Sequence, residues 1–234
     1  YPGYTTANGG LLRERDLLTE LNHFTATDAS AGEQRQQWLR SHNLDSPNND
    51  LRVCLFGYAE PATQRFVDAL LGLNRPITIF ISESLANGLA LNAGDPRLRR
   101  HSWLDQPDFD RLLASCDLNI VRGEDSWLRA QWTGQPMFWQ PYRQAGAAHL
   151  VKLAAYLDRL LADADPIVAN AIRQAMLTLN SRDGRDPAPA LVDWFTHLDE
   201  VRQIHRRWRD DLARQSPLSE RLLTFCRDHL QLAI

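Results

Sequence analysis

LRVCLFGYAEP, residues 51–61, is the stretch that decides the fold. Its first six residues form a largely apolar run that contains valine and cysteine, which is typical of a buried strand. Gly57 and Tyr58 then interrupt the run, and Pro61 stands where proline is favoured, in the first turn of a helix. The stretch therefore predicts a strand over 51–56, a short loop, and a helix over 61–71.

The same alternation continues along the middle of the chain. Apolar runs predict further strands over 76–82, 118–121 and 135–139. Helical spacing, with Asp105 as a cap and Gly134 as a stop, predicts helices over 83–91, 105–116 and 126–133. Strands that are apolar throughout and alternate with helices indicate a parallel sheet covered on both faces. We therefore expect an α/β, Rossmann-like fold.

The two flanks of this region are helical. Before it, helices are expected over 16–24 and 32–40, and residues 43–50, rich in Asn, Asp, Ser and Pro, are expected to form a linker. After Tyr142 the strand pattern disappears, and apolar spacing predicts helices over 146–162, 166–179, 190–213 and 219–230.

Composition excludes several classes of protein. A formal net charge of -3 gives no basic surface for a nucleic-acid backbone, and no apolar run reaches the length of a membrane helix. Neither nucleic acid nor membrane is therefore expected as a partner, and a cytoplasmic protein is expected. Cys54, Cys116 and Cys226 are far apart in the sequence, which predicts reduced, buried thiols and no zinc site.

The densest group of chemically useful residues is Arg122-Gly123-Glu124-Asp125-Ser126, between the strand expected over 118–121 and the following helix. Ligands of parallel sheets bind at the carboxyl ends of strands, where helix N-termini present free N–H groups. Ser126 would cap the helix, Arg122 would hold a pyrophosphate, and Glu124 would accept hydrogen bonds from ribose or sugar hydroxyls. The alternative is a plain helix cap with a surface ion pair between Arg122 and Glu124.

Two further groups of residues are expected near the carboxyl ends of the strands. Gly57 would permit close approach of a ligand and Tyr58 could stack on a base, although both also suit an ordinary turn. Gln106, Phe109 and Asp110 open the helix before the strand over 118–121. Here an amide and an aromatic ring could read a pyrimidine, or Phe109 could simply pack inward.

Other patterns argue against competing functions. The sequence has no Gly-x-Gly-x-x-Gly, no Walker A loop and no Gly-x-Ser-x-Gly, which disfavours dehydrogenases, P-loop enzymes and hydrolases of the α/β type. The basic run over 202–209 is flanked by Asp199, Glu200, Asp210 and Asp211, so a solvated helix face is expected there.

A longer motif goes beyond these local patterns. The stretch 116–126, continued by Arg129-Ala130-Gln131-Trp132 and Gly134, resembles the signature of the protein-arginine rhamnosyltransferases (EarP) that modify elongation factor P. The opening Pro2-Gly3-Tyr4, with residues 9–14, is also similar to that family at the point where its first domain ends. The resemblance spans most of the chain.

The resemblance implies a GT-B architecture, in which two Rossmann-like domains face each other and the carboxyl-terminal one binds dTDP-rhamnose. Tyr58, Gln106 and Phe109 match positions that hold the thymidine or nearby groups. The positions that bind the ribose and pyrophosphate are matched by Arg122, Glu124, Asp125, Ser126 and Tyr142. The implied reaction is an inverting, metal-independent transfer of rhamnose to an arginine of elongation factor P. The family's catalytic Asp has no counterpart here, so no catalytic residue is assigned.

The expected domain plan follows from this resemblance. Residues 1–50 would end the first domain and form the linker, residues 51–215 would bind the nucleotide sugar, and residues 216–234 would form a helix that packs back on the first domain. The absence of an initiating Met suggests that residues are missing upstream, so this chain alone is expected to be inactive. Two alternatives remain open: a nucleotide-sugar-binding module without transfer activity, and a GT-B glycosyltransferase with another donor or acceptor.

Overall fold

A five-stranded parallel sheet organises the computed structural model, which describes residues 3–5, 8–26 and 28–230. Pro2 of the opening motif and residues 231–234 of the expected last segment lie outside the described residues. The strands are β1 Leu51–Phe56, β2 Ile77–Ser82, β3 Leu98–His101, β4 Leu118–Arg122 and β5 Met137–Gln140. They lie in the order β3-β2-β1-β4-β5 and all pairs are parallel, which confirms the predicted α/β fold.

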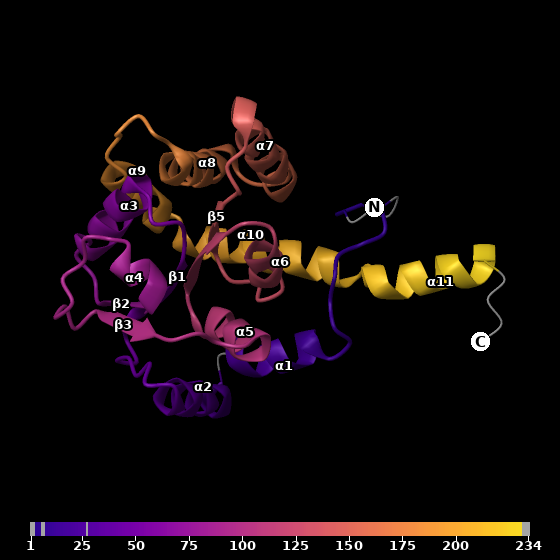
Figure 1. Cartoon of the computed structure of the whole chain (residues 1–234), viewed down its shortest axis with the longest axis horizontal. Coiled ribbons are helices and arrows are strands. Elements are labelled where there is room, and N and C mark those ends of the chain that lie inside the picture. The colour runs from indigo at the N-terminus through magenta and orange to yellow at the C-terminus, as the bar shows by residue number, and fades with distance from the viewer. Residues whose placement is uncertain (1–2, 6–7, 27, 231–234) are drawn as a thin grey trace.

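Helices cover both faces of the sheet (Figure 1). Those before β4 are α1 Leu17–Thr25, α2 Ala29–Ser41, α3 Pro61–Leu71, α4 Glu83–Asn87 and α5 Gln106–Ser115. Those after it are α6 Asp125–Gln131, α7 Ala148–Leu160 behind a 3-10 turn at Ala145–Ala147, α8 Pro166–Asn180, α9 Ala188–Thr196, α10 Leu198–Ala213 and α11 Leu218–Leu230. Helices α3, α8 and α9 pack together on one face, and α1, α2 and α5 lie on the other.

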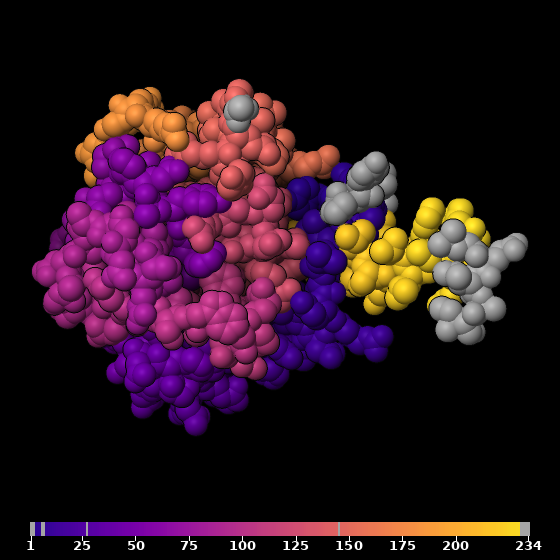
Figure 2. Space-filling view, viewed as in Figure 1, coloured from indigo at the N-terminus to yellow at the C-terminus, as the bar shows by residue number. Residues whose placement is uncertain are grey.

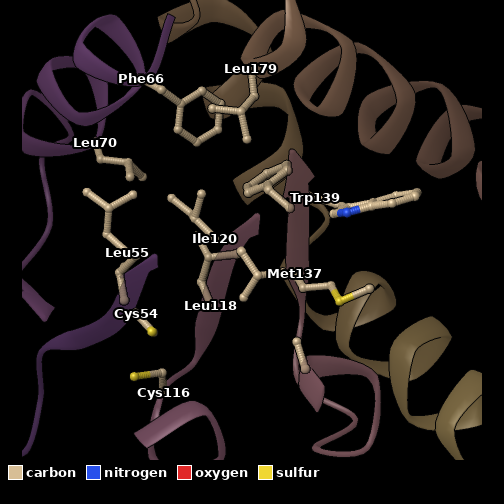
Figure 3. Packing of buried hydrophobic residues seen from close by; sticks show 14 of the residues in the cluster. Cys54, Leu55, Phe66, Leu70, Cys116, Leu118, Ile120, Met137, Trp139 and Leu179 are labelled. Atoms are coloured by element: carbon tan, nitrogen blue, oxygen red, sulfur yellow. The ribbon is translucent and has the colours of Figure 1, made fainter. Parts of the chain in front are cut away.

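The core follows the alternation of side chains along each strand. Leu55 and Ile120 are partners across β1 and β4 and point to the face that Phe66 of α3 and Leu179 of α8 cover (Figure 3). Cys54 points to the other face, beside Cys116. Both thiols are fully buried, and burial raises the pKa of Cys54 to about 12. Cys226 is partly exposed, so the prediction of buried thiols was wrong for that residue.

Three elements of the structure differ from the prediction. The edge strand β3 was missed because it reads Leu-Arg-Arg-His, and an edge strand with two half-exposed arginines lacks the continuous apolar pattern of a central strand. The helix expected over 83–91 ends at Asn87, with Gly88 as its cap. The segment 190–213 forms two helices, because the backbone at His197 leaves helical geometry.

Helix α10 also differs from its expected character as a solvated face. One side of it is buried, with His205 fully inside the protein and Trp208 donating from Nε1 to Gln131 Oε1 at 2.8 Å. The prediction rested on the flanking acidic residues, which lie on the exposed side of the helix, and it therefore missed the buried side.

At the end of the chain, α11 projects away from the body (Figures 1 and 2). The N-terminal segment holds its base, because the Leu218 N–H donates to the Leu11 carbonyl at 3.0 Å and Gln215 Nε2 donates to the Tyr4 carbonyl at 2.7 Å. Leu222, Leu223 and Phe225 on this helix are more than half exposed. Within the described residues, no helix combines the length and apolarity needed to cross a membrane.

The buried His205 makes stability depend on pH. Its ring lies between the Val201 carbonyl, 2.9 Å from Nδ1, and the Met137 N–H, 3.4 Å from Nε2. Burial lowers the pKa of His205 to about 4, while the bond to Val201 opposes that fall. In the unfolded chain the pKa is near 6.5, so below that pH only the unfolded state gains a proton and stability falls until about pH 4.

We therefore expect the free energy of unfolding to drop by about 2 kcal/mol from pH 7 to pH 5 through His205 alone. Urea unfolding of the wild type and of His205→Gln at both pH values measures this contribution. The difference between the two proteins should shrink by that amount at pH 5. An unchanged difference would contradict the account.

Candidate functional site

The order of the strands creates a crevice at one edge of the sheet. From β1 the chain moves outward through β2 and β3, then crosses back to β4 on the other side of β1. The loops that leave the carboxyl ends of β1 and β4 therefore turn in opposite directions, and ligands of such sheets bind at this switch point. The loop after β1 contains Gly57 and Tyr58, and the loop after β4 contains Gly123 and Glu124.

A buried glutamine holds these two loops together. Gln140, at the end of β5, is 2% exposed. Its backbone carbonyl accepts from the Gly123 N–H at 2.9 Å, and its Oε1 accepts from the Tyr58 N–H at 3.0 Å. Its Nε2 donates to Thr63 Oγ1 at 3.0 Å, in the first turn of α3. One residue thus fixes the β1 loop, the β4 loop and the start of α3 relative to one another.

Two glycines are required by this arrangement. A Cβ at Gly57 would lie 2.7 Å from Gln140 Oε1, so a side chain there would displace the glutamine. Gly123 has a φ of +63°, in the left-handed region that glycine adopts at little cost. Trp139 Nε1 donates to the Gly123 carbonyl at 2.6 Å and holds the turn in place.

Arg122 lies at the centre of the switch point. Its guanidinium carbon is 4.9 Å from the centre of the Phe56 ring and 5.0 Å from that of Tyr58. Within the described residues it forms no ion pair, and Glu124 pairs instead with Lys152 Nζ at 3.2 Å. The alternative of a surface pair between Arg122 and Glu124 is therefore wrong, and the guanidinium edge is available to a ligand.

Tyr58 is half-buried beside this arginine. Burial raises the pKa of its phenol, and the Arg122 charge opposes that rise. The hydroxyl therefore stays protonated near neutral pH and can donate a hydrogen bond.

The expected cap of the following helix was wrong. Helix α6 begins at Asp125, its N-cap position is Glu124, and no side chain caps it. Ser126 is thus inside the first turn. The first backbone N–H groups of a helix have no acceptor within the helix, and at α6 no capping side chain supplies one.

A cleft of about 590 Å³ opens beside Arg122, along the carboxyl ends of β1, β2 and β3. Four of the predicted residues line it: Gln106, Phe109, Asp125 and Ser126. Phe56 and Phe109 form its apolar wall, with ring centres 5.1 Å apart. Tyr58, Arg122, Glu124 and Tyr142 lie outside the lining of the cleft, and Tyr142 is 60% exposed.

Charged residues anchor the far wall of the cleft. Asp110 is buried and forms a bidentate ion pair with Arg129. Arg129 Nη1 also donates to the two carboxylate oxygens of Glu14, at 2.9 and 2.7 Å. Gln106 Nε2 donates to Asp110 Oδ1 at 3.1 Å. Burial raises the pKa of Asp110, and Arg129 opposes that rise. Arg129 therefore fixes α5 and, through Asp110, the orientation of Gln106.

Several residues of the site were not predicted from the sequence. Gln140 and Arg129 position the others, and His101 and Trp103 line the cleft, with Trp103 86% exposed. The signal that could have revealed Trp103 is a tryptophan placed just before the Asp105 cap, close to the end of a strand. No local pattern marks Gln140, since its three partners are distant in sequence.

Comparisons with known proteins agree on one family. The family model for the elongation factor P (EF-P) rhamnosyltransferase EarP matches residues 1–227. Protein-arginine rhamnosyltransferases of Pseudomonas aeruginosa and Pseudomonas putida are 33% and 34% identical to this chain. Each alignment covers 98% of this chain but 63% of the relative, so the chain spans less than two thirds of the length of these relatives.

Solved structures are similar as well. A structure that describes EarP-mediated arginine glycosylation of translation elongation factor EF-P matches with a TM-score of 0.82 and 30% identity. That match covers 98% of this chain and 75% of the other. Anabaena HepE in complex with UDP and glucose matches with a TM-score of 0.52 and 14% identity, over 91% of this chain and 55% of the other, which shows a shared fold.

The role of Gln140 can be tested by substitution. In Gln140→Leu the Tyr58 N–H and the Thr63 hydroxyl lose their buried partner, so we expect a loss of about 1–3 kcal/mol in the free energy of unfolding. Urea unfolding measures the loss. Gln37→Leu, at an exposed position of α2, is the matched control and should change stability by less than about 0.5 kcal/mol. Equal effects of the two variants would contradict a positioning role for Gln140.

Proposed function

The chain belongs to the EarP family of elongation factor P rhamnosyltransferases, and we propose that it supplies the donor-binding half of such an enzyme. The reaction proposed is transfer of L-rhamnose from dTDP-β-L-rhamnose to an arginine side chain of elongation factor P. The chain would act together with an N-terminal domain, since its matched relatives are considerably longer.

The observation that supports the proposal most strongly is the position of the Arg122 guanidinium. A guanidinium without a carboxylate partner, placed at a switch point, suits the two phosphates of a nucleotide sugar. The free N–H groups at the start of α6 would add further donors to the same oxygens. In this arrangement the rings of Phe56 and Tyr58, both close to the guanidinium, would restrict its movement.

The remaining predicted residues fit the other parts of the donor. Phe109 and Gln106 offer a ring and an amide in an apolar cleft, which suits the face and edge of a pyrimidine. Tyr58 would bind near the same part of the donor. Glu124, Asp125, Ser126 and Tyr142 would bind the ribose and pyrophosphate.

The proposed chemistry is an inverting displacement. A guanidinium nitrogen of the acceptor attacks the anomeric carbon of rhamnose, and the bond from that carbon to the pyrophosphate oxygen breaks. A carboxylate must orient the guanidinium and take its proton as the new bond forms. We place that carboxylate, an Asp, in the N-terminal domain. Arg122 would stabilise the charge of the departing nucleoside diphosphate, a task that a metal ion performs in other enzymes.

The domain plan belongs to this proposal too. Residues 51–215 form the donor-binding domain, and residues 1–50 end the first domain and lead into the second. Exposed Leu222, Leu223 and Phe225 give α11 an apolar side suited to packing on the first domain. By itself the chain would bind donor without transferring sugar.

Calorimetric titration tests donor binding directly. We expect this chain to bind dTDP-rhamnose and dTDP more tightly than UDP or GDP. Arg122→Ala and Glu124→Ala should each weaken binding by about 1–3 kcal/mol, because each removes charge-assisted hydrogen bonds. Arg173→Ala is the matched control, since this surface arginine on α8 pairs with Asp158 and lies outside the proposed site.

Unchanged affinity in both Arg122→Ala and Glu124→Ala would overturn the site assignment. Tighter binding of UDP or GDP than of dTDP would favour a glycosyltransferase with another donor. If the chain binds dTDP-rhamnose but the chain joined to its N-terminal domain transfers no rhamnose, a binding module without transfer activity is the better account.

A further inference from the structure

A second hollow, of about 470 Å³, lies at the opposite edge of the sheet from the proposed donor site. Its floor is formed by residues at the amino ends of strands: Arg52 in β1, Asp117 just before β4 and Gln135 before β5. Residues of α2 and α10 and the end of α1 form its walls. We refer to it as the amino-edge pocket.

The amino-edge pocket has more positive than negative charge. Four arginines line it, Arg35, Arg52, Arg202 and Arg206, against two aspartates, Asp117 and Asp199. The aspartates are already engaged. Asp117 Oδ2 accepts from the backbone N–H of Arg52 at 2.9 Å, and its Oδ1 lies 3.6 Å from Arg202. Asp199 accepts from Arg202 at 3.1 Å. Two carboxylates therefore leave the four guanidiniums only partly neutralised.

Several donors around this pocket have no protein partner. Arg52 is 7% exposed, and its one side-chain bond within the described residues runs from Nε to Ser46 Oγ at 3.0 Å. Its two terminal nitrogens are therefore free. Around the same pocket, Arg35 Nε and Ser115 Oγ are buried without a hydrogen-bond partner among the described residues, and Ser115 is 4% exposed. Buried donors left unpaired are costly, so their gathering around one hollow points to a missing acceptor.

The arginines also act on one another. Burial, and then the neighbouring charge of Arg52, lowers the pKa of Arg35, although Asp117 partly offsets both. The two guanidiniums are thus held together against their mutual repulsion. An anion between them would remove that repulsion and accept the free hydrogen bonds at the same time.

We propose that the amino-edge pocket binds a small phosphate-bearing anion. A tetrahedral phosphate offers several acceptor oxygens and up to two negative charges, which matches several guanidinium groups around one pocket better than a single carboxylate does. The binding site is separate from Arg122, because it lies at the amino ends of the same strands whose carboxyl ends lead to the donor site. The inference therefore does not depend on the proposed transferase activity.

Titration of the chain with inorganic phosphate, at constant ionic strength, tests this proposal. We expect saturable binding that Arg202→Gln and Arg52→Gln each weaken about tenfold or more, the loss expected for one charge-assisted contact. Arg202 is partly exposed, so its replacement should leave the fold intact, and thermal unfolding checks the fold of both variants.

Two control variants separate this pocket from other anion sites. Arg173→Gln removes a surface arginine on α8 and should bind phosphate as the wild type does. Arg122→Gln removes the arginine of the proposed donor site, and in that variant the phosphate binding that depends on Arg202 should persist. Loss of phosphate binding in Arg122→Gln, with Arg202→Gln unaffected, would overturn the proposal. So would the absence of saturable phosphate binding in the wild-type chain.

Discussion

The hydrogen bonds of Gln140 are the constraint on which the site depends. A parallel sheet brings the ends of β1 and β4 side by side, but the loops that follow are free to diverge. Gln140 joins those loops from inside the protein, through one backbone and two side-chain hydrogen bonds. Because water does not reach it, these bonds compete with no solvent and hold Gly57 and Gly123 in place. Arg122 then lies against the rings of Phe56 and Tyr58.

The central part of the fold could be predicted from the sequence, because its strands and helices are determined by residues that are close together along the chain. The strand over 51–56 and the helix over 61–71 have the expected bounds, since an apolar run, a glycine and a proline fall in the right order. At the edge of the sheet this reasoning failed. The strand β3 keeps two arginines at half-exposed positions, and its pairing with β2 depends on contacts that sequence spacing does not contain.

The candidate site was partly predictable for the same reason. Arg122 through Ser126 follow a strand directly, so position alone suggested a ligand site. Helix α6 has no side-chain cap, and Glu124 pairs with Lys152; both features depend on tertiary packing around Lys152 and around the backbone near Gly123. Gln140 and Arg129 act on residues far away along the chain, and one sequence contains no sign of such contacts.

We propose above all that a nucleoside diphosphate binds at the edge of the sheet held by Gln140. A crystal structure of this chain with dTDP tests it most directly. We expect the pyrophosphate to lie against the Arg122 guanidinium and the first N–H groups of α6, with the thymine in the cleft beside Phe109. A nucleotide bound elsewhere, for instance among the arginines at the amino ends of the strands, with Arg122 still free, would contradict it.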